Sequence, residues 1–464
     1  MRIESLKKGF TRKVLVKVST IAALMTLAYL LAALYFTNHF FMRTVVNGVD
    51  ISLKAYADVD KIMEAHVKDF VLTVMESDGK TEEIKGQDIG LKYKSENSIP
   101  KIYKLQNSLS WVTGIWKSQY YVTDTLFTYS NKALENRINR LHCLNRKITE
   151  SENVSFRYSN GAFEAVKEVY GNKIRIDKLT QEIINGILRG ETGLDLKGRE
   201  CYYNPVYKAE SKKARKTLDL LNKIISANIT YLFGRDQAVL DGGTIHQWLK
   251  IDENLDVDIE KEAVAKYVKS LAKKFDTVGI ARQFKTSLGK TLEVKGGLYG
   301  WKIDQPSEVE SLMEAVRQGA VIKKEPIYKQ KALNRGEDEI GNTYVEINIT
   351  RQHLWFYKDG KLITHGPVVT GNPARGNPTV VGAYMLNYKQ EGATLSGLGY
   401  EVKVKYWMPF YGNIGLHDAS WRHAFGGQIY KSRGTHGCVN APLYLAKKIY
   451  EYIGDGIPII SYEE

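Results

Sequence analysis

The sequence predicts a multidomain α+β protein: an N-terminal transmembrane helix, tandem α/β repeat modules, and a C-terminal mostly-β sandwich with a short helix. Three observations predict this order. An uncharged apolar stretch lies near the N-terminus, the middle of the chain repeats itself, and the last 120 or so residues alternate as strands do. A chain of 464 residues is also too long for one hydrophobic core.

The first element is an apolar helix that follows a basic tail. Residues 1–17 carry six lysines and arginines against one glutamate, and residues 18–36 contain no charge. A helix of that length spans about 28 Å, close to the thickness of a bilayer core. The basic tail should stay in the cytoplasm, so we expect an uncleaved single-pass anchor over 18–38 with the rest outside the cell. A cleaved signal peptide is the alternative, although its apolar stretch is usually shorter.

Charge and cysteine content add two constraints. The formal net charge of +14 and the pI near 9.2 indicate anionic surroundings, such as lipid headgroups, nucleic acid or an acidic wall polymer. Three cysteines allow at most one disulfide, so at least one thiol is unpaired. Cys143 and Cys201 are interpreted as small hydrophobic residues, with a disulfide between them as the alternative. Cys438 is then the thiol that needs an explanation.

The region from 45 to 125 predicts a first extracellular α/β region, with a β-hairpin turning at Asp78-Gly79. An internal repeat follows, because residues 163–190 resemble 292–319 at an offset of 129. A Tyr-Gly pair precedes the helical stretch in both copies, and a glycine ends both. We expect repeat modules over 126–210 and 211–335; chance similarity between two amphipathic helices is the alternative.

The polar, charged segment 320–342 is interpreted as a domain boundary. The chain then alternates as strands and turns at Asp359-Gly360, which predicts a β-sandwich or partly closed barrel over 342–463. One helix is expected from 440 to 453, with Asn440 as its N-cap and Pro442 in its first turn.

The stretch "SRGTHGCVNAP" places Cys438 just before that helix. A helix N-terminus favours an anion, so we expect a lowered thiol pKa and a reactive thiolate. The N–H groups around Gly437 and Cys438 could stabilise a developing oxyanion. Two other interpretations stay open on these grounds: a structural cysteine, and a zinc site made of His417, Asp418, His436 and Cys438, whose spacing fits no common ligand pattern.

The run from His417-Asp418 through seventeen residues to Thr435-His436-Gly437-Cys438 and Asn440 resembles the signature of the L,D-transpeptidase catalytic (YkuD) domain. The resemblance extends upstream through "VVTGNPARGNPTVVGAYML" and covers about 342–463. One departure from common forms is Val380, where a proline often follows the threonine. The two modules in front more loosely resemble the peptidoglycan-binding type 4 repeats of membrane-anchored enzymes from Gram-positive bacteria.

The resemblance implies a set of catalytic roles. Cys438 would be the nucleophile, His417 its general base, and Asp418 the residue that orients the histidine. Gly437, with the Cys438 amide, would contribute to the oxyanion hole. His436 would support the site, either directly or only by stabilising the loop.

Other residues would contact substrate rather than act chemically. This set is Thr435, Asn440, Arg422 and Trp407, and His423 is not expected to be catalytic. No metal or other cofactor is implied.

The implied function is a cell-wall L,D-transpeptidase at the cell membrane, with its catalytic domain facing the wall. It would form 3→3 peptidoglycan cross-links through a cysteine thioester, releasing D-alanine from a tetrapeptide stem. Its partners would be a donor stem, an acceptor amine and the membrane, with no nucleic acid, and carbapenem-type β-lactams would be covalent inhibitors. The alternatives are an L,D-carboxypeptidase, D-amino-acid exchange on the same substrate, or a non-catalytic wall-binding scaffold.

Overall fold

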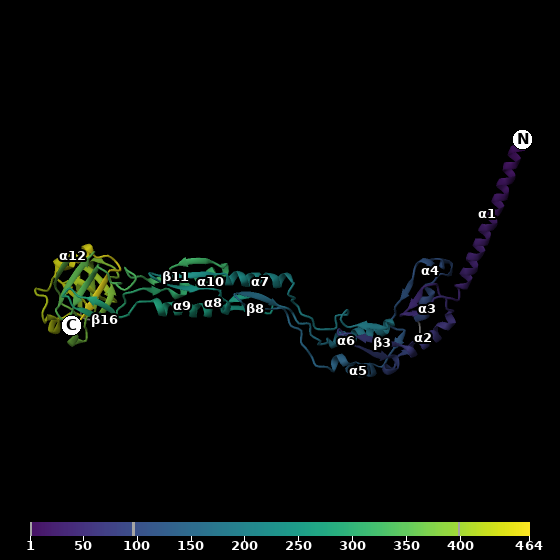
Figure 1. Ribbon diagram of the computed structural model, residues 1–464, viewed down its shortest axis with the longest axis horizontal. Coiled ribbons are helices and arrows are strands. Elements are labelled where there is room, and N and C mark those ends of the chain that lie inside the picture. The colour runs from purple at the N-terminus through teal and green to yellow at the C-terminus, as the bar shows by residue number, and fades with distance from the viewer. Residues whose placement is uncertain (1, 95–97, 398–399) are drawn as a thin grey trace. The chain divides into compact units, whose positions relative to one another are not determined.

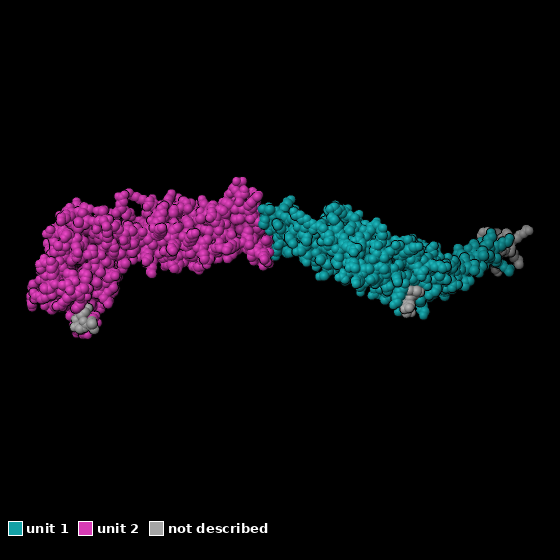
Figure 2. Space-filling view, turned by 90° about the horizontal axis from the view of Figure 1, so that it is seen from below, with its two compact units in different colours: residues 1–155, 165–211 teal, residues 156–164, 212–464 magenta. Residues whose placement is uncertain are grey.

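The structure is a computed structural model that describes residues 2–94, 98–397 and 400–464. The chain divides into two compact units, one of Met1–Ser155 with Ala165–Ser211 and one of Phe156–Glu164 with Lys212–Glu464 (Figures 1 and 2). Helices and strands occur in both units, which confirms the predicted α+β class.

The N-terminal helix α1 runs over Arg2–Tyr35, so it includes most of the basic tail. Its segment Arg12–Tyr35 is long and apolar enough to cross a membrane, by length and composition. The helix ends before residue 38, where we expected the span to end, because turn-type hydrogen bonds join Thr37 to Leu34 and Asn38 to Tyr35.

The first unit contains small sheets with short helices around them. The hairpin predicted at Asp78-Gly79 is confirmed, since β3 pairs antiparallel with β4 and Gly79 has a positive φ of 85°. After α1, the helices and strands of this part of the chain are β1 Thr44–Val46, β2 Val49–Asp50, α2 Val59–Asp69, β3 Val71–Met75, β4 Thr81–Lys85, β5 Lys92–Tyr93, α3 Ser98–Lys104, α4 Thr113–Trp116, β6 Gln119–Tyr121, β7 Phe127–Thr128, α5 Asn131–Asn139, β8 Ser155–Ser159, β9 Ala162–Val166, α6 Ile176–Arg189 and β10 Gly193–Asp195.

The second unit takes in most of the β8–β9 hairpin, and from Lys212 on it continues with the second copy of the repeat. Its elements are α7 Lys212–Ile225, β11 Asn228–Phe233, β12 Asp236–Leu240, α8 Gly242–Ile245, β13 Leu249–Ile251, β14 Val257–Ile259, α9 Lys261–Phe275, β15 Arg282–Lys285, β16 Thr291–Val294, β17 Lys302–Ile303, α10 Gln305–Gln318, β18 Val321–Lys324 and β19 Tyr328–Gln330. The polar segment 320–342 therefore contributes two strands to this module.

The internal repeat is visible in the secondary structure. Helices α6 and α10 have 14 residues each and start 129 residues apart, and each ends at a left-handed glycine, Gly190 or Gly319. The strand after each helix pairs in parallel with an earlier hairpin, β10 with β3 and β18 with β11. The repeated unit therefore starts further upstream than residue 126, because β3 and β4 correspond to β11 and β12.

A hairpin within each repeat packs onto the module that follows. Phe163 of the β8–β9 hairpin is buried in the core of the second repeat. Phe284 and Val294 of the β15–β16 hairpin share a core with Ile460 and Tyr462 of the C-terminal domain. The second repeat and the C-terminal domain thus bury a common apolar surface.

The C-terminal domain is the predicted sandwich of two sheets. One sheet has the order β22-β21-β20-β28-β23 and the other β24-β25-β26-β27. Their elements are β20 Tyr344–Asn348, β21 His353–Lys358, β22 Lys361–Pro367, β23 Gly382–Met385, β24 Gln390–Gly397, β25 Tyr400–Tyr411, β26 Ile414–Asp418, α11 Ile429–Arg433, β27 Val439–Ala441, α12 Leu443–Tyr452 and β28 Pro458–Tyr462. Apolar side chains of both sheets and of α12 form one core.

The expected helix from 440 to 453 is wrong at its start. Residues 439–441 form β27, which pairs in parallel with β26, and Asn440 exchanges both main-chain hydrogen bonds with Val369. Asn440 is therefore a strand residue rather than an N-cap, and Pro442 occupies the N-cap position of α12. Cys438 is separated from the helix by a whole strand.

Candidate active site

A cavity of about 490 Å³ lies beside the open face of the second sheet of the C-terminal domain. It brings together most of the residues that the sequence analysis singled out: Trp407, His417, Arg422, Thr435, His436, Cys438 and Asn440. Asp418 and Gly437 lie next to lining residues but do not line it themselves.

Strand pairing brings the histidine and the cysteine to one place. His417 lies on β26, and Cys438 immediately precedes β27. The parallel register pairs Leu416 with Val439, so Cys438 is the residue immediately before the first paired residue of β27. Two residues that are twenty-one positions apart in sequence thereby face the same cavity.

His417 is buried, with 3% of its surface exposed, and its orientation is fixed. Its Nδ1 lies 2.8 Å from the main-chain carbonyl oxygen of Asp418. Because a carbonyl only accepts, Nδ1 must carry the proton, which leaves Nε2 as an acceptor. Burial lowers the pKa of His417, so the imidazole is neutral at pH 7 and able to take up a proton.

Asp418 orients the histidine through its main chain rather than through its carboxylate. The carboxylate instead accepts hydrogen bonds from the main-chain N–H groups of Lys405, at 2.7 Å, and Tyr406, at 2.8 Å. The side chain therefore ties β26 to β25, and the carbonyl holds the ring. The contact between residue 418 and the histidine therefore uses the main-chain carbonyl oxygen and not the side chain.

The Cys438 thiol is largely enclosed, and its Sγ lies 3.5 Å from the carbonyl oxygen of Asn413. Burial raises the pKa of Cys438, although a hydrogen bond from the Gly415 main chain opposes this. The predicted lowering of the thiol pKa is therefore wrong in this structure, because β27 separates the thiol from the N-terminus of α12. The resting cysteine is a thiol and needs a base.

The hydroxyl groups of two threonines hold the main chain of the loop before Cys438 in place. Gly437 donates its N–H to Thr435 Oγ1 at 3.0 Å, and its carbonyl accepts from Thr379 Oγ1 at 2.7 Å. Thr435 Oγ1 also donates to the Cys438 carbonyl at 2.6 Å. Two expectations change: the Gly437 N–H already has a partner and is not directed at an oxyanion, and the Thr435 hydroxyl is used within the loop.

Glycine is required at 437 for two reasons. Its φ is +117°, a conformation that other residues rarely adopt, and a Cβ there would lie 3.0 Å from Ile414 Cδ1. The turn therefore allows Cys438 to reach the cavity.

Two polar atoms of lining residues are buried and have no hydrogen-bond partner within the described ranges. They are Arg422 Nε and Asn440 Oδ1. Arg422 is held by a hydrogen bond from its Nη2 to the Arg433 carbonyl at 2.9 Å. Unpaired buried polar atoms cost free energy, so a donor and an acceptor next to a thiol suggest contacts that a substrate completes.

Trp407 forms one wall of the site. It pairs with His417 across β25 and β26, and the two ring centroids are 5.8 Å apart. Its indole Nε1 donates to the Tyr388 hydroxyl at 3.3 Å. The ring centroids of Trp421 and His417 are 6.1 Å apart, so the imidazole is flanked by two indole rings that shield it from water.

The sequence analysis missed the hairpin formed by β24 and β25. Thr394, Leu395, Ser396 and Val402 line the cavity, and Leu395 and Cys438 pack against a cluster that includes Trp407. The only sequence signal was the alternation of residues 400–411, which predicts a strand but does not place it over the site. Residues 398–399 lie outside the described part of the chain.

The described residues form no assembled metal site. Within residues 2–94, 98–397 and 400–464, no group of three or more His, Cys, Asp or Glu side chains is arranged to hold an ion. Of the four side chains considered as zinc ligands, His417 commits Nδ1 to the Asp418 carbonyl, and the Asp418 carboxylate holds the main chain of β25.

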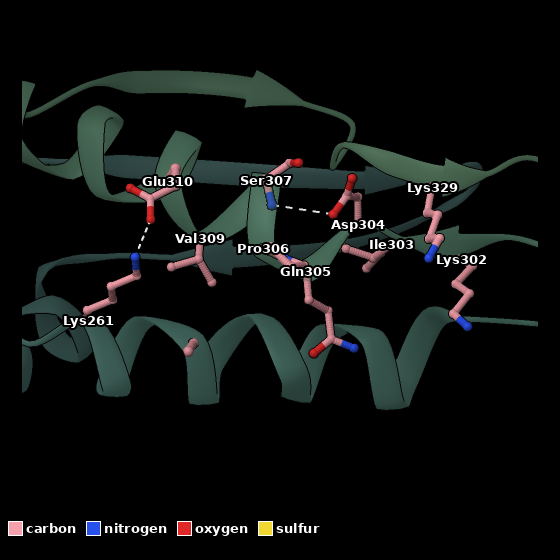
Figure 3. A pocket seen from close by; sticks show the side chains of 11 residues that line it. Lys261, Lys302, Ile303, Asp304, Gln305, Pro306, Ser307, Val309, Glu310 and Lys329 are labelled. Atoms are coloured by element: carbon pink, nitrogen blue, oxygen red, sulfur yellow. Dashed lines mark hydrogen bonds and ion pairs between the residues drawn. The ribbon is translucent and has the colours of Figure 1, made fainter.

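A second cavity, of about 780 Å³, lies in the second repeat between α9, the start of α10 and strands β17 and β19. Figure 3 shows the Lys261–Glu310 ion pair at one end and Lys302 and Lys329 at the other. Neither Lys302 nor Lys329 has an ion pair with any residue that the structure describes. Among the described residues, the groove therefore presents two ammonium groups outside any ion pair, beside an apolar floor.

A neutral buried imidazole and a thiol in one cavity can act as base and nucleophile, which is the arrangement found in acyl-transferring enzymes. The L,D-transpeptidase catalytic domain family matches residues 342–460, and peptidoglycan-binding type 4 domains match residues 82–195 and 207–322. A search of curated proteins gave no match.

Several solved structures are similar in sequence. The Ldtfm–avibactam carbamoyl enzyme is 32% identical, with 54% of this chain and 99% of that chain covered and a TM-score of 0.44. A mutant of the Enterococcus faecium L,D-transpeptidase is also 32% identical, with 53% and 100% covered and a TM-score of 0.44. The E. faecium catalytic domain acylated by ertapenem is 38% identical, with 26% and 97% covered and a TM-score of 0.25.

With this identity over the full length of its relatives, the chain belongs to the L,D-transpeptidase family. It is an L,D-transpeptidase that also carries peptidoglycan-binding domains.

Proposed function

We propose that this enzyme forms 3→3 cross-links in peptidoglycan, with Cys438 as nucleophile and His417 as general base. The observation that carries the proposal is the fixed tautomer of His417, whose protonated Nδ1 faces the Asp418 carbonyl and whose free Nε2 can accept the thiol proton. A partly buried thiol with a raised pKa requires such a base.

In the first half-reaction, the thiol proton moves to His417 Nε2 as Sγ attacks the carbonyl carbon of the third residue of a donor tetrapeptide stem. The bond between that carbon and the D-alanine nitrogen breaks. His417 returns the proton to the leaving amine, so D-alanine departs as a neutral amine and the donor remains as a thioester on Cys438. The Cys438 amide is the oxyanion donor in this proposal, because the Gly437 N–H is bound to Thr435.

In the second half-reaction, a side-chain amine of an acceptor stem attacks the thioester carbonyl. His417 takes a proton from that amine, the carbon–sulfur bond breaks, and the proton returns to sulfur. A thioester suits this step because it stays reactive toward amines. The hairpin residues Leu395 and Val402 give the cavity an apolar lining, which would favour transfer to an amine over hydrolysis.

Arg422 and Asn440 are proposed to bind the donor. The guanidinium of Arg422 suits the terminal carboxylate of the tetrapeptide, and Asn440 Oδ1 suits a peptide N–H. His436 lines the cavity and is assigned a supporting position rather than a proton transfer.

The apolar helix and the repeats would position the enzyme. We infer that Arg12–Tyr35 anchors the chain in the cell membrane, with the catalytic domain on the wall side. The groove with Lys302 and Lys329 would bind acidic groups of the wall polymer.

The decisive experiment incubates the purified enzyme with disaccharide tetrapeptides and analyses the products by mass spectrometry. Cross-linked dimers that have lost D-alanine are expected, and none with Cys438→Ala. Tripeptides alone would instead indicate an L,D-carboxypeptidase, and wall binding without turnover would indicate a scaffold. Full activity of Cys438→Ala would refute the mechanism.

Inhibition supplies a second readout on the same residue. Because a relative is acylated by ertapenem, we expect carbapenem-type β-lactams to add covalently to Cys438. The expected mass shift should map to the peptide that contains Cys438 and be absent from Cys438→Ala.

A further inference from the structure

The first unit exposes a group of large apolar side chains just after α3. They belong to the segment 105–122, which includes α4 and β6. Trp116 is 78% exposed and Tyr120 73%, and the group also contains Leu105, Leu109, Ile115 and Val122. Scattered exposed apolar residues are ordinary, but six within eighteen positions mark a surface that meets an apolar partner.

This segment packs directly against the proposed anchor. Trp111 Nε1 donates to the Tyr29 carbonyl at 3.2 Å, and the Tyr29 hydroxyl donates to the Leu109 carbonyl. The Trp111 ring also stacks on Phe36, with centroids 5.9 Å apart. Figure 1 shows α3 and α4 near the C-terminal end of α1.

The contact with Tyr29 fixes how far the segment reaches along the helix. Tyr29 precedes Tyr35, the last residue of the apolar span, by six positions. At 1.5 Å per residue, the Tyr29 carbonyl lies about 9 Å back along the helix axis from the end of the span, and the Trp111 indole that bonds it reaches that level. A segment at that depth is level with apolar residues of the helix rather than beyond them.

The charges of the segment suit a bilayer surface. Residues 98–122 contain three lysines, Lys101, Lys104 and Lys117, and no aspartate or glutamate. All three lysines are exposed. Tryptophan and tyrosine with lysine are the residues that gather at membrane interfaces, and lysines there attract anionic headgroups.

We propose that residues 105–122 form a second membrane contact, in which Leu109, Ile115 and Trp116 enter the outer leaflet beside α1 and the lysines meet anionic phospholipid headgroups. The proposal rests on the anchor inferred above. It gives the first unit a fixed orientation at the membrane, because a helix alone leaves that unit free to tilt, whereas two contacts do not.

The test uses the full chain in vesicles of phosphatidylcholine and phosphatidylglycerol that contain a doxyl-labelled phosphatidylcholine. Flotation reports the anchor, and quenching of tryptophan fluorescence by the shallow doxyl group reports the contact. Trp116→Phe should lower the lipid-dependent quenching about twofold, since Trp111 and Trp116 are the two tryptophans at the interface. Trp355→Phe, in the other unit, is the matched control and should leave it unchanged.

The outcomes separate the proposals. Flotation without quenching, or equal quenching in Trp116→Phe and wild type, would overturn the second contact and leave the anchor in place. Failure to float would overturn both the anchor and the contact. Cross-linking activity, measured in detergent with Cys438→Ala as the inactive control, reports the catalytic proposal separately; Cys438→Ala should float and be quenched as wild type.

Discussion

Thr379 Oγ1 donates to the carbonyl oxygen of Gly437 at 2.7 Å and accepts the N–H of Gly371 at 2.9 Å. Its hydroxyl thus links the segment before β23 to the loop that carries Cys438. Both bonds are buried, so the position of the thiol depends on a residue far from it in sequence.

Thr379→Val keeps the shape of the side chain and removes the hydroxyl. We expect a fall in kcat of about 10- to 100-fold, because a displacement of the nucleophile by about 1 Å costs that much. Steady-state kinetics on disaccharide tetrapeptides measure it. Thr379→Ser should retain most of the activity, and an equal loss in both variants would show that the hydroxyl is not the cause.

The pH dependence of alkylation distinguishes a thiol from a thiolate at position 438. Burial raises the pKa of Cys438 above its ordinary value of 9.0, so modification by iodoacetamide should be slow at neutral pH and increase above pH 9. Cys143 and Cys201 should not compete, because burial raises their pKa values to about 12 and about 11. Peptide mapping assigns the adduct, and rapid alkylation at pH 7 would contradict the prediction.

The pKa of the base also sets the pH below which kcat/KM should decline. Burial lowers the pKa of His417 below its ordinary value of 6.5, so the imidazole stays unprotonated until the pH falls below that value. Activity should therefore be retained between pH 7 and 6.5 and decline only at lower pH. A decline that starts above pH 6.5 would indicate a different base.

A buried ion pair joins the β15–β16 hairpin of the second repeat to the segment just before the C-terminal domain. Arg282 Nη2 lies 2.8 Å from Glu339 Oε2, and both side chains are less than a tenth exposed. Glu339→Ala leaves the guanidinium buried without its partner, which should cost about 3–5 kcal/mol of unfolding free energy. Urea unfolding measures the change, and Glu337→Ala, at an exposed position in the same segment, should be close to neutral.

The groove of the second repeat offers a test of wall binding. Replacing both Lys302 and Lys329 by alanine should weaken binding to isolated peptidoglycan by up to about 30-fold, since each exposed ion pair contributes up to about 1 kcal/mol. A Lys266→Ala, Lys269→Ala variant removes the same charge from the exposed face of α9 and should bind as wild type. An equal loss of peptidoglycan binding in the two double variants would show that only the net charge of the protein matters.

Local patterns were enough to predict much of the architecture. The offset of 129 residues placed α6 and α10 correctly, because an amphipathic stripe ending at a glycine depends only on nearby residues. The start of the repeat was missed, because β3 and β4 join the module only through the parallel pairing of β10 with β3.

The active-site errors came from contacts between distant segments. The predicted helix began at residue 440, yet β26 and Val369 hold residues 439–441 in a strand. That pairing moves the helix dipole away from Cys438 and changes the expected direction of its pKa shift. The Gly437 N–H was likewise expected to be available, although the Thr435 hydroxyl binds it.

The sequence by itself determined the order of the domains, the apolar N-terminal helix, and the histidine, cysteine and glycine that the site is built from, because residue type and spacing carry that information. Only the tertiary structure decided that His417 uses the Asp418 carbonyl, that Cys438 rests as a partly buried thiol, and that the β24–β25 hairpin lines its cavity. Burial and hydrogen-bond partners set protonation and access, and both depend on strands that meet only in the folded chain.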